Sequence, residues 1–268
     1  MSGMLSPEIL VLGASGRVGS GVVAALLEAG SPVLAVGRDD SRLQALAQRH
    51  ADEPALELLA GSVATDREAA RLAAQVAERP RRLRAVIDTI AGPRRSARLL
   101  DRRATVLRHS LDRGLLPHLT AARHLLPLLA NDSRQGEVDA ARYLLIGGPQ
   151  AECGWAGYGH ASITGAALRM LAKVLHEEAL PLGVRLQLLA VDAPVWDADN
   201  ASSACSGWHA ALAVGRSAVS LVAGSGRPDC IVACSARDAI PASPLLARDF
   251  AQALQAAAGT HDGDRAAA

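Results

Sequence analysis

The 268-residue chain contains few aromatic residues and a single lysine, Lys173. Aromatic side chains make up 2% of it, and Tyr143, Tyr158 and Phe250 are its only tyrosines and its only phenylalanine. An extended base-stacking surface is hard to build from so few rings, which counts against binding of single-stranded nucleic acid. The formal net charge of +1 also provides no overall field that would attract nucleic acid or a membrane surface.

Cysteine is also scarce, and the four residues Cys153, Cys205, Cys230 and Cys234 lack the spacing of a metal site. Cys230 and Cys234 share one expected strand, where four residues span about 13 Å, too far for a disulfide. We therefore expect small core cysteines in a reducing compartment and no metal. Residues 1–7 lack a signal-peptide pattern, and no uncharged apolar run reaches the ~18 residues of a membrane span. The expected location is the cytoplasm.

Short apolar runs alternate with longer amphipathic stretches along the chain. Strands are expected at residues 9–12, 32–36, 56–59, 84–88, 142–146, 184–191 and 230–233, and helices at 18–29, 41–50, 66–78, 96–107, 115–130, 159–180 and 209–223. Repeated strand–helix units of this length predict an α/β protein with a doubly wound parallel sheet, the Rossmann fold. We expect a single domain over residues 1–256, followed by a frayed tail over 257–268.

A glycine-rich turn follows the first expected strand directly and opens the first expected helix. Its GxxGxxG spacing is carried by Gly13, Ala14, Ser15, Gly16, Arg17, Val18 and Gly19. Glycines permit a tight turn there, so that the N–H groups of the helix N-terminus can face a pyrophosphate. A purely structural turn is the alternative. The position early in a doubly wound pattern favours a dinucleotide site, with every residue of the turn except Ala14 among its contacts.

The end of the second expected strand selects the dinucleotide. Sites for NAD usually place an acid there, whereas this chain has Gly37 and Arg38. Arg17 and Arg38 can both form charge-assisted hydrogen bonds to a 2′-phosphate, so the sequence predicts NADP. Two alternatives remain: Asp39 or Asp40 meets the ribose instead, or Arg38 is a solvated surface charge.

From Ile9 to Ala236 the chain resembles the short-chain dehydrogenase/reductase superfamily. Apart from the glycine turn, the resemblance rests on four segments: Thr89-Ile90-Ala91-Gly92, Leu126-Pro127, Gly183-Val184-Arg185 and Tyr158-Gly159-His160-Ala161-Ser162. The last falls where the family has its Tyr-x-x-x-Lys element. The resemblance implies cofactor contacts from Ser62, Ala91, Gly92 and Val195.

The resemblance also implies catalytic roles, and most of the family's catalytic residues are missing. Tyr158 is expected to donate the proton, and Ser162 stands at the lysine position, where it can bond a ribose hydroxyl but supplies no charge. Gly147-Gly148-Pro149 replace the family's serine, and the asparagine position falls near Asp112, Arg113 and Gly114. Without a cation beside it, Tyr158 is expected to stay protonated, which impairs oxidation more than reduction. His160 points to the other side of the expected helix, where we expect it to pack or to face solvent.

Two further segments have alternative interpretations. The arginine-rich stretch over residues 79–113 includes Arg94 and Arg95, which either clamp an anionic substrate or belong to a solvated or subunit-contacting surface. Because family members commonly pair through the helices that follow, the resemblance implies a homo-oligomer. Residues 195–208 occupy the substrate-lid position, where Trp196 and Trp208 either cover a substrate or pack in the ordinary way.

Three functions are consistent with these observations. The first is an NADP-dependent oxidoreductase that reduces a carbonyl or activated alkene of a small-molecule substrate, with Tyr158 as proton donor. The second is a protein that binds NADP without turnover, as a sensor or pseudo-enzyme. The third is non-redox chemistry on the same fold, such as isomerisation or elimination. The sequence favours the enzyme by a small margin, through analogy with the fold.

Overall fold

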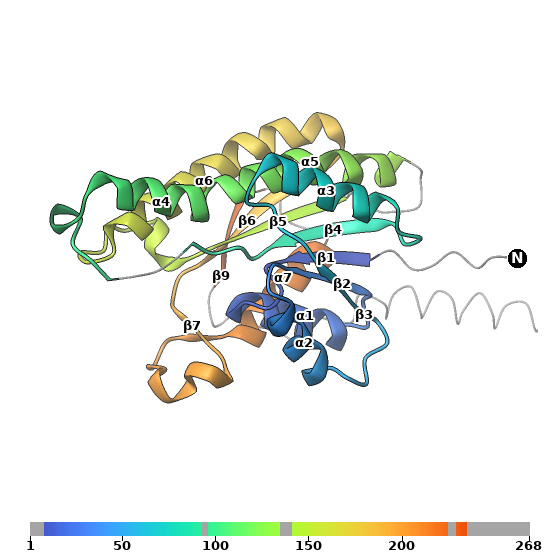
Figure 1. Cartoon of the computed structure of the whole chain (residues 1–268), viewed down its shortest axis with the longest axis horizontal. Coiled ribbons are helices and arrows are strands. Elements are labelled where there is room, and N and C mark those ends of the chain that lie inside the picture. Colours follow the sequence, from blue (N-terminus) through green and yellow to red (C-terminus); the bar gives the residue numbers. More distant parts are fainter. Residues whose placement is uncertain (1–7, 93–95, 135–140, 225–228, 235–268) are drawn as a thin grey trace, which may run out of the picture.

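The structure is a computed structural model that describes residues 8–92, 96–134, 141–224 and 229–234. Within these residues, parallel strands form one large sheet with helices on both faces (Figure 1). Its strands are β1 (Glu8–Leu12), β2 (Val33–Gly37), β3 (Leu56–Ala60), β4 (Leu83–Asp88), β5 (Arg142–Gly147), β6 (Arg185–Val191) and β9 (Ile231–Cys234). The helices are α1 (Arg17–Glu28), α2 (Asp40–Arg49), α3 (Asp66–Ala77), α4 (Ala104–Gly114), α5 (Leu116–Arg134), α6 (Gly159–Ala179) and α7 (Ala211–Ala223).

The strand order β3-β2-β1-β4-β5-β6-β9 confirms the predicted doubly wound fold. The direction of the strand order reverses between β1 and β4, which are direct neighbours in the sheet. Leu12 at the end of β1 is in register with both Val36 of β2 and Asp88 of β4, so the three strands end at the same level. In open α/β sheets the crevice beyond the carboxyl ends of the strands at such a reversal is where ligands bind. We therefore expect a ligand-binding site at the residues that directly follow β1, β2 and β4.

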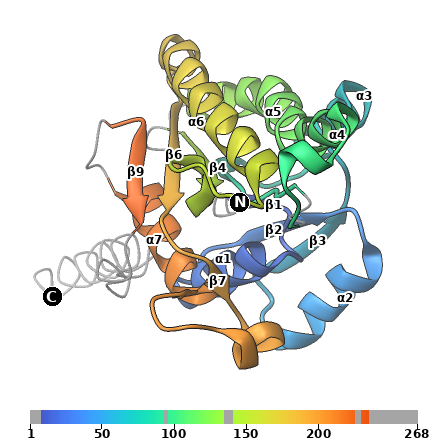
Figure 2. The same cartoon turned by 90° about the vertical axis from the view of Figure 1, so that its left-hand side faces the viewer.

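The two faces of the sheet are covered by different sets of helices. Helices α1, α2 and α7 lie on one face, and α3, α4, α5 and α6 lie on the other (Figures 1 and 2). Each face has its own apolar core, and the fully buried Tyr143 of β5 belongs to the core beneath α5 and α6. On the opposite face, α1 and α7 approach closely because Gly21 and Gly215 have no side chains at their contact.

The structure corrects two of the predicted helices. The expected helix over residues 96–107 is wrong, because Arg102 and Arg103 adopt extended backbone angles between a short 3-10 turn and α4. The helix expected over 209–223 begins later, at Ala211, because His209 and Ala210 form a strand, β8, that pairs in parallel with β7 (Val195–Trp196). The predicted tail over 257–268 lies outside the described residues.

The cysteine prediction is wrong for two of the four residues. Cys153 and Cys205 are exposed, because they lie in the loops after β5 and between β7 and β8, whereas Cys234 is buried and Cys230 is partly buried. No group of histidine, cysteine and acidic residues suited to a metal ion occurs in the described part of the chain. None of the helices described is long and apolar enough to cross a membrane.

Candidate functional site

A cleft of about 570 Å³ opens at the carboxyl ends of β1, β2, β3 and β4. Most of the residues that the sequence assigned to a cofactor line it: Gly13, Ser15, Gly16, Arg17, Val18, Arg38, Ser62, Ala91, Gly92 and Val195. Gly19 is not among the lining residues. A Cβ atom at Gly19 would lie 2.2 Å from the carbonyl oxygen of Gly13, so this glycine lets α1 pack under the turn.

The turn after β1 has the geometry of an anion site. Gly13 adopts a positive φ of 73°, which L side chains rarely adopt, and its carbonyl accepts the N–H of Gly16 at 2.8 Å. Helix α1 begins with Gly16 as its N-cap, and neither a capping side chain nor an acidic residue occupies its first turn. The N–H groups of this turn and the helix dipole thus point to the cleft without competition from a carboxylate of the helix itself.

Three arginines line the cleft near this turn. Arg38 is exposed at the end of β2, and Arg17 forms an ion pair with Asp197 at 3.3 Å. Arg42, which the sequence analysis missed, donates to the carbonyl oxygen of Ser15 at 2.8 Å and so ties α2 to the glycine turn. Arg42 could have been predicted from its position in the first helical turn of α2, because the start of α2 lies beside the glycine turn.

Asp39 also lines the cleft, but its carboxylate is engaged in capping α2. It accepts the backbone N–H of Arg42 at 3.2 Å and the hydroxyl of Ser41 at 2.7 Å. The Ser41 hydroxyl, followed by the Arg42 N–H, lowers the pKa of Asp39. Asp40, the other acid considered for a ribose contact, is not among the lining residues.

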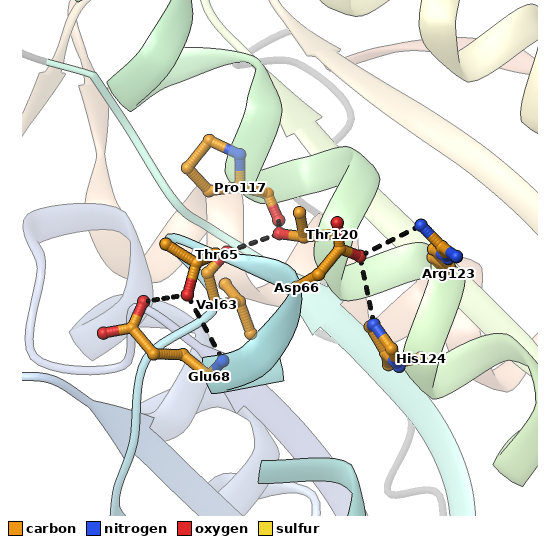
Figure 3. Close-up of polar contacts among 8 residues, drawn as sticks. All are labelled: Val63, Thr65, Asp66, Glu68, Pro117, Thr120, Arg123 and His124. Atoms are coloured by element: carbon orange, nitrogen blue, oxygen red, sulfur yellow. Dashed lines mark hydrogen bonds and ion pairs between the residues drawn. The ribbon is translucent and has the colours of Figure 1, made fainter. Parts of the chain in front are cut away.

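The far wall of the cleft is formed by the loop after β3 and by α5. The hydroxyl of Thr120 on α5 donates to the carbonyl of Val63, and Asp66 at the start of α3 accepts from Arg123 and His124 of α5 at 3.3 and 3.1 Å (Figure 3). Thr65 caps α3 by accepting the N–H of Glu68 (Figure 3). These contacts hold Ser62 and Val63 against α5 at the end of the cleft where an adenine would lie.

A second, smaller cavity of about 90 Å³ continues the cleft towards β5 and α6. The two share six lining residues: Val18, Thr89, Ile90, Ala91, Gly92 and Val195. Beyond them, the wall of the small cavity combines small residues such as Gly114, Gly148, Ala161 and Gly165 with larger ones such as Ile146, Gln150 and Leu168. This is the end of the cleft where the nicotinamide of a bound dinucleotide would lie, if its pyrophosphate sits on the glycine turn.

Neither predicted catalytic residue lines the cleft or the small cavity. Tyr158 is the N-cap of α6, with its ring edge-on to Trp155 at a centroid distance of 6.4 Å. Ser162 is buried, and its hydroxyl accepts the N–H of Trp155 at 3.2 Å. The face of α6 that reaches the cavity carries Ala161 and Gly165, one turn apart, and Ser162 is rotated away from it by about 100°.

The wall of the small cavity instead includes His118, one member of a buried acid–histidine pair that the sequence analysis missed. Asp88, the last residue of β4, is fully buried, and its Oδ2 lies 2.8 Å from Nδ1 of His118 on α5. His118 is 1% exposed and lines the cavity. The available signal was an aspartate at the end of a strand that is otherwise mostly apolar, because such a carboxylate needs a partner when it is buried.

A third cavity, of about 410 Å³, lies beside α4 and is lined by basic side chains. Arg102, Arg113, His109 and His160 contribute to it, and His160 is buried, as expected of a packing residue. Arg94 and Arg95, considered above for a substrate clamp, lie outside the described residues. The arginine-rich stretch thus contributes to a basic cavity through Arg102 and Arg113.

The segment after β6 closes over the glycine turn. His209 of β8 is buried and contacts the Asp192 carboxylate at 2.5 Å, while Asp197 caps the following 3-10 turn and pairs with Arg17. Trp196 and Trp208 are partly buried and line neither the cleft nor the small cavity, which favours packing over covering a substrate.

Comparison with known proteins identifies relatives of the whole arrangement. The family model for short chain dehydrogenase matches residues 7–199. No curated protein matches the sequence. A short-chain dehydrogenase from Streptomyces avermitilis is similar in structure, with 17% sequence identity, 100% of each chain covered and a TM-score of 0.70.

Two further similar structures were solved with a nucleotide. A gluconate 5-dehydrogenase from Burkholderia cenocepacia, in complex with NADP and tartrate, has 17% identity, covers 86% of this chain and 94% of its own, and has a TM-score of 0.73. The Pseudomonas aeruginosa RhlG/NADP active-site complex has 20% identity, covers 88% of this chain and 98% of its own, and has a TM-score of 0.74. At these identities the likeness concerns the fold.

Proposed function

Because the chain belongs to the short-chain dehydrogenase family, we propose that it binds NADP(H) in the cleft and reduces a carbonyl or activated alkene of a small molecule. The observation that carries the proposal is an uncapped, acid-free helix N-terminus beside three arginines that line the same cleft. Two of the similar structures hold NADP, which supports the same cofactor here.

The residues of the cleft fit an NADP molecule. The glycine turn would hold the pyrophosphate through the N–H groups at the start of α1. Gly19 allows the turn to lie close to α1, because a Cβ atom there would force the turn away from the helix. Arg38 and Arg42 would bind the 2′-phosphate, with Arg17 joining them if the phosphate displaces Asp197 from it. NADP(H), when bound, supplies or accepts a hydride at its nicotinamide ring.

Substitution of the arginines tests the cofactor. The double variant Arg38→Ala/Arg42→Ala should weaken NADPH binding by about 10- to 100-fold, because a charge-assisted hydrogen bond contributes about 1.5–3 kcal/mol. NADH affinity should change little, and Arg67→Ala on the exposed surface of α3 is the matched control. Equal losses for NADPH and NADH would show that these residues do not read the 2′-phosphate.

The proton donor is a separate part of the proposal. Tyr158 is the candidate that the family resemblance supplies, although it lies outside the walls of both cavities. Tyr158→Phe tests it: loss of NADPH oxidation at unchanged NADPH affinity would assign the proton to Tyr158.

A second function is favoured by the walls of the small cavity. Gly147, Gly148 and Pro149 stand where the resemblance places the family's serine, and Ser162, at the lysine position, does not line the cavity, so the family's own polarising groups are absent from this wall. A protein that binds NADP without turnover is the function that this wall favours. Absence of NADPH oxidation across a panel of aldehydes, ketones and enones, with NADPH binding retained, would support it over the reductase.

A further inference from the structure

A buried carboxylate, that of Asp88, contacts His118, which lines the small cavity. Asp88 ends β4 within the sheet and is fully buried, where an unpaired carboxylate costs several kcal/mol. Two groups compensate it: Oδ1 accepts the backbone N–H of Ile90 at 3.0 Å, and Oδ2 contacts Nδ1 of His118 at 2.8 Å. The carboxylate is thus held in one orientation by an adjacent loop and by α5.

The contact with Asp88 determines how His118 presents its ring. Because a carboxylate accepts hydrogen bonds, Nδ1 carries the hydrogen and donates it to Asp88. Nε2 lies on another edge of the ring, and no residue in the described ranges forms a hydrogen bond with it. His118 lines the small cavity, and Nε2 is the ring nitrogen that Asp88 does not engage.

The other polar side chains on the cavity wall are committed elsewhere or carry no charge. The hydroxyl of Thr89 donates to the carbonyl of Leu12 at 2.7 Å, and that of Thr164 donates to the carbonyl of His160 at 2.8 Å. Ser110 and Gln150 are neutral. Among the described residues that line this cavity, His118 is the only ionisable one.

A third buried group lies beside the pair. Tyr143 of β5 is fully buried and lies near the Asp88 carboxylate. Burial, and then the nearby Asp88 carboxylate, raise the pKa of Tyr143 well above its usual value. Tyr143 therefore stays neutral and adds no competing charge to the pair.

We propose that His118, positioned by Asp88, is the proton donor and acceptor at the nicotinamide end of the cleft. This inference rests on the proposed function. In reduction, hydride adds to the carbonyl carbon, the π electrons of the C=O bond move to oxygen, and the oxygen takes the Nε2 proton of the imidazolium. The products are the alcohol, NADP⁺ and neutral His118, which regains a proton from solvent. Asp88 is a positioning residue that fixes the ring orientation and keeps the hydrogen on Nδ1.

Substitution separates this role from a structural one. His118→Asn keeps an amide N–H near Nδ1 that can bond Asp88, but it removes Nε2. Across a panel of aldehydes, ketones and enones, it should lower kcat for NADPH oxidation by about 10²- to 10⁴-fold at unchanged NADPH affinity. His124→Asn, on the same helix but paired with Asp66 at the surface (Figure 3), is the matched control and should keep its rate. An unchanged kcat in His118→Asn, or a loss confined to Tyr158→Phe, overturns the proposal.

Asp88→Asn tests the positioning role. The amide is a weaker partner for the Nδ1 hydrogen, so kcat for NADPH oxidation should fall at unchanged NADPH affinity and the imidazole NMR signals of His118 should change their tautomer pattern. A merely structural aspartate would leave the tautomer pattern in place.

A test that needs no substrate uses imidazole NMR of the intact wild-type protein, with the His118 signals assigned through His118→Asn. Titration with NADP⁺ should shift the Nε2 signal of His118, whereas adenosine 2′,5′-bisphosphate, which lacks the nicotinamide, should leave it in place. Binding of NADP⁺ that moves other signals but not those of His118 overturns this inference and leaves the proposed function standing. Failure of NADP⁺ to shift any signal overturns the proposed function, and this inference with it.

Discussion

Arg79 binds one buried and one exposed carboxylate near the amino ends of the strands, whereas the cleft lies at their carboxyl ends. It forms a two-pronged pair with the buried Glu8 at 2.8 and 2.9 Å and a further bond to the exposed Glu57 at 2.8 Å. Arg79→Met should reduce the free energy of unfolding by about 3–5 kcal/mol, because Glu8 becomes a buried charge without its partner. Urea denaturation measures the loss. Arg67→Met on exposed α3 should change it by under about 0.5 kcal/mol, and a similar small effect for Arg79→Met would contradict the account.

The four thiols should differ in reactivity according to their surroundings. Burial raises the pKa of Cys230, so less of it is the reactive thiolate at neutral pH, and Cys234 is buried, whereas Cys153 and Cys205 are exposed. Iodoacetamide should therefore modify Cys153 and Cys205 first, and the other two mainly after unfolding in urea. Peptide mass spectrometry reads the order, and modification of Cys230 as fast as Cys153 would contradict it.

At the residue scale the sequence predicted the cofactor turn better than the chemistry beside it. Ten of the eleven residues assigned to the cofactor line the cleft, because their positions follow from chain order around one strand–turn–helix unit. The Asp88–His118 pair could not be predicted in this way. Its members are 30 residues apart, and only the packing of α5 on β4 brings them together.

At the scale of elements, α1 and α7 make their contact through glycine. A Cβ atom on Gly215 would lie 2.2 Å from the carbonyl oxygen of Gly21, so the two helices would have to separate. Gly215→Ala should therefore destabilise the fold by about 1–3 kcal/mol, although alanine is the better helix former. Gly154→Ala, where a Cβ atom meets nothing within 4 Å, is the control, and urea denaturation compares the two. A gain in stability for Gly215→Ala would contradict the contact.

Helix α6 shows why the catalytic assignment differs from the geometry. The sequence correctly predicts a long helix that begins after Tyr158, but the face that a helix presents depends on its rotation against its neighbours. Here the cavity receives Ala161 and Gly165, and Tyr158 lies before the first helical residue. Periodicity identifies which residues share a face and leaves open which face meets the cavity.

At the scale of the whole molecule, the fold was predictable because a chain of parallel strands that alternate with helices allows few arrangements. The observed strand order and the two helical layers follow from that pattern. The strands β7 and β8 were not predictable, because each has two residues and depends on the other for its hydrogen bonds. The expectation of a homo-oligomer stays a prediction, which light scattering can test.

The central claim is that the cleft at the strand reversal binds NADP(H), and thermal unfolding with added nucleotide tests it most directly. At a hundredfold excess over its Kd, NADPH should stabilise the fold by about 2.7 kcal/mol and raise Tm by about 5–10 °C. NADH at the same concentration should raise Tm less, because it lacks the 2′-phosphate that the arginines bind. A Tm that NADPH leaves unchanged would contradict the account.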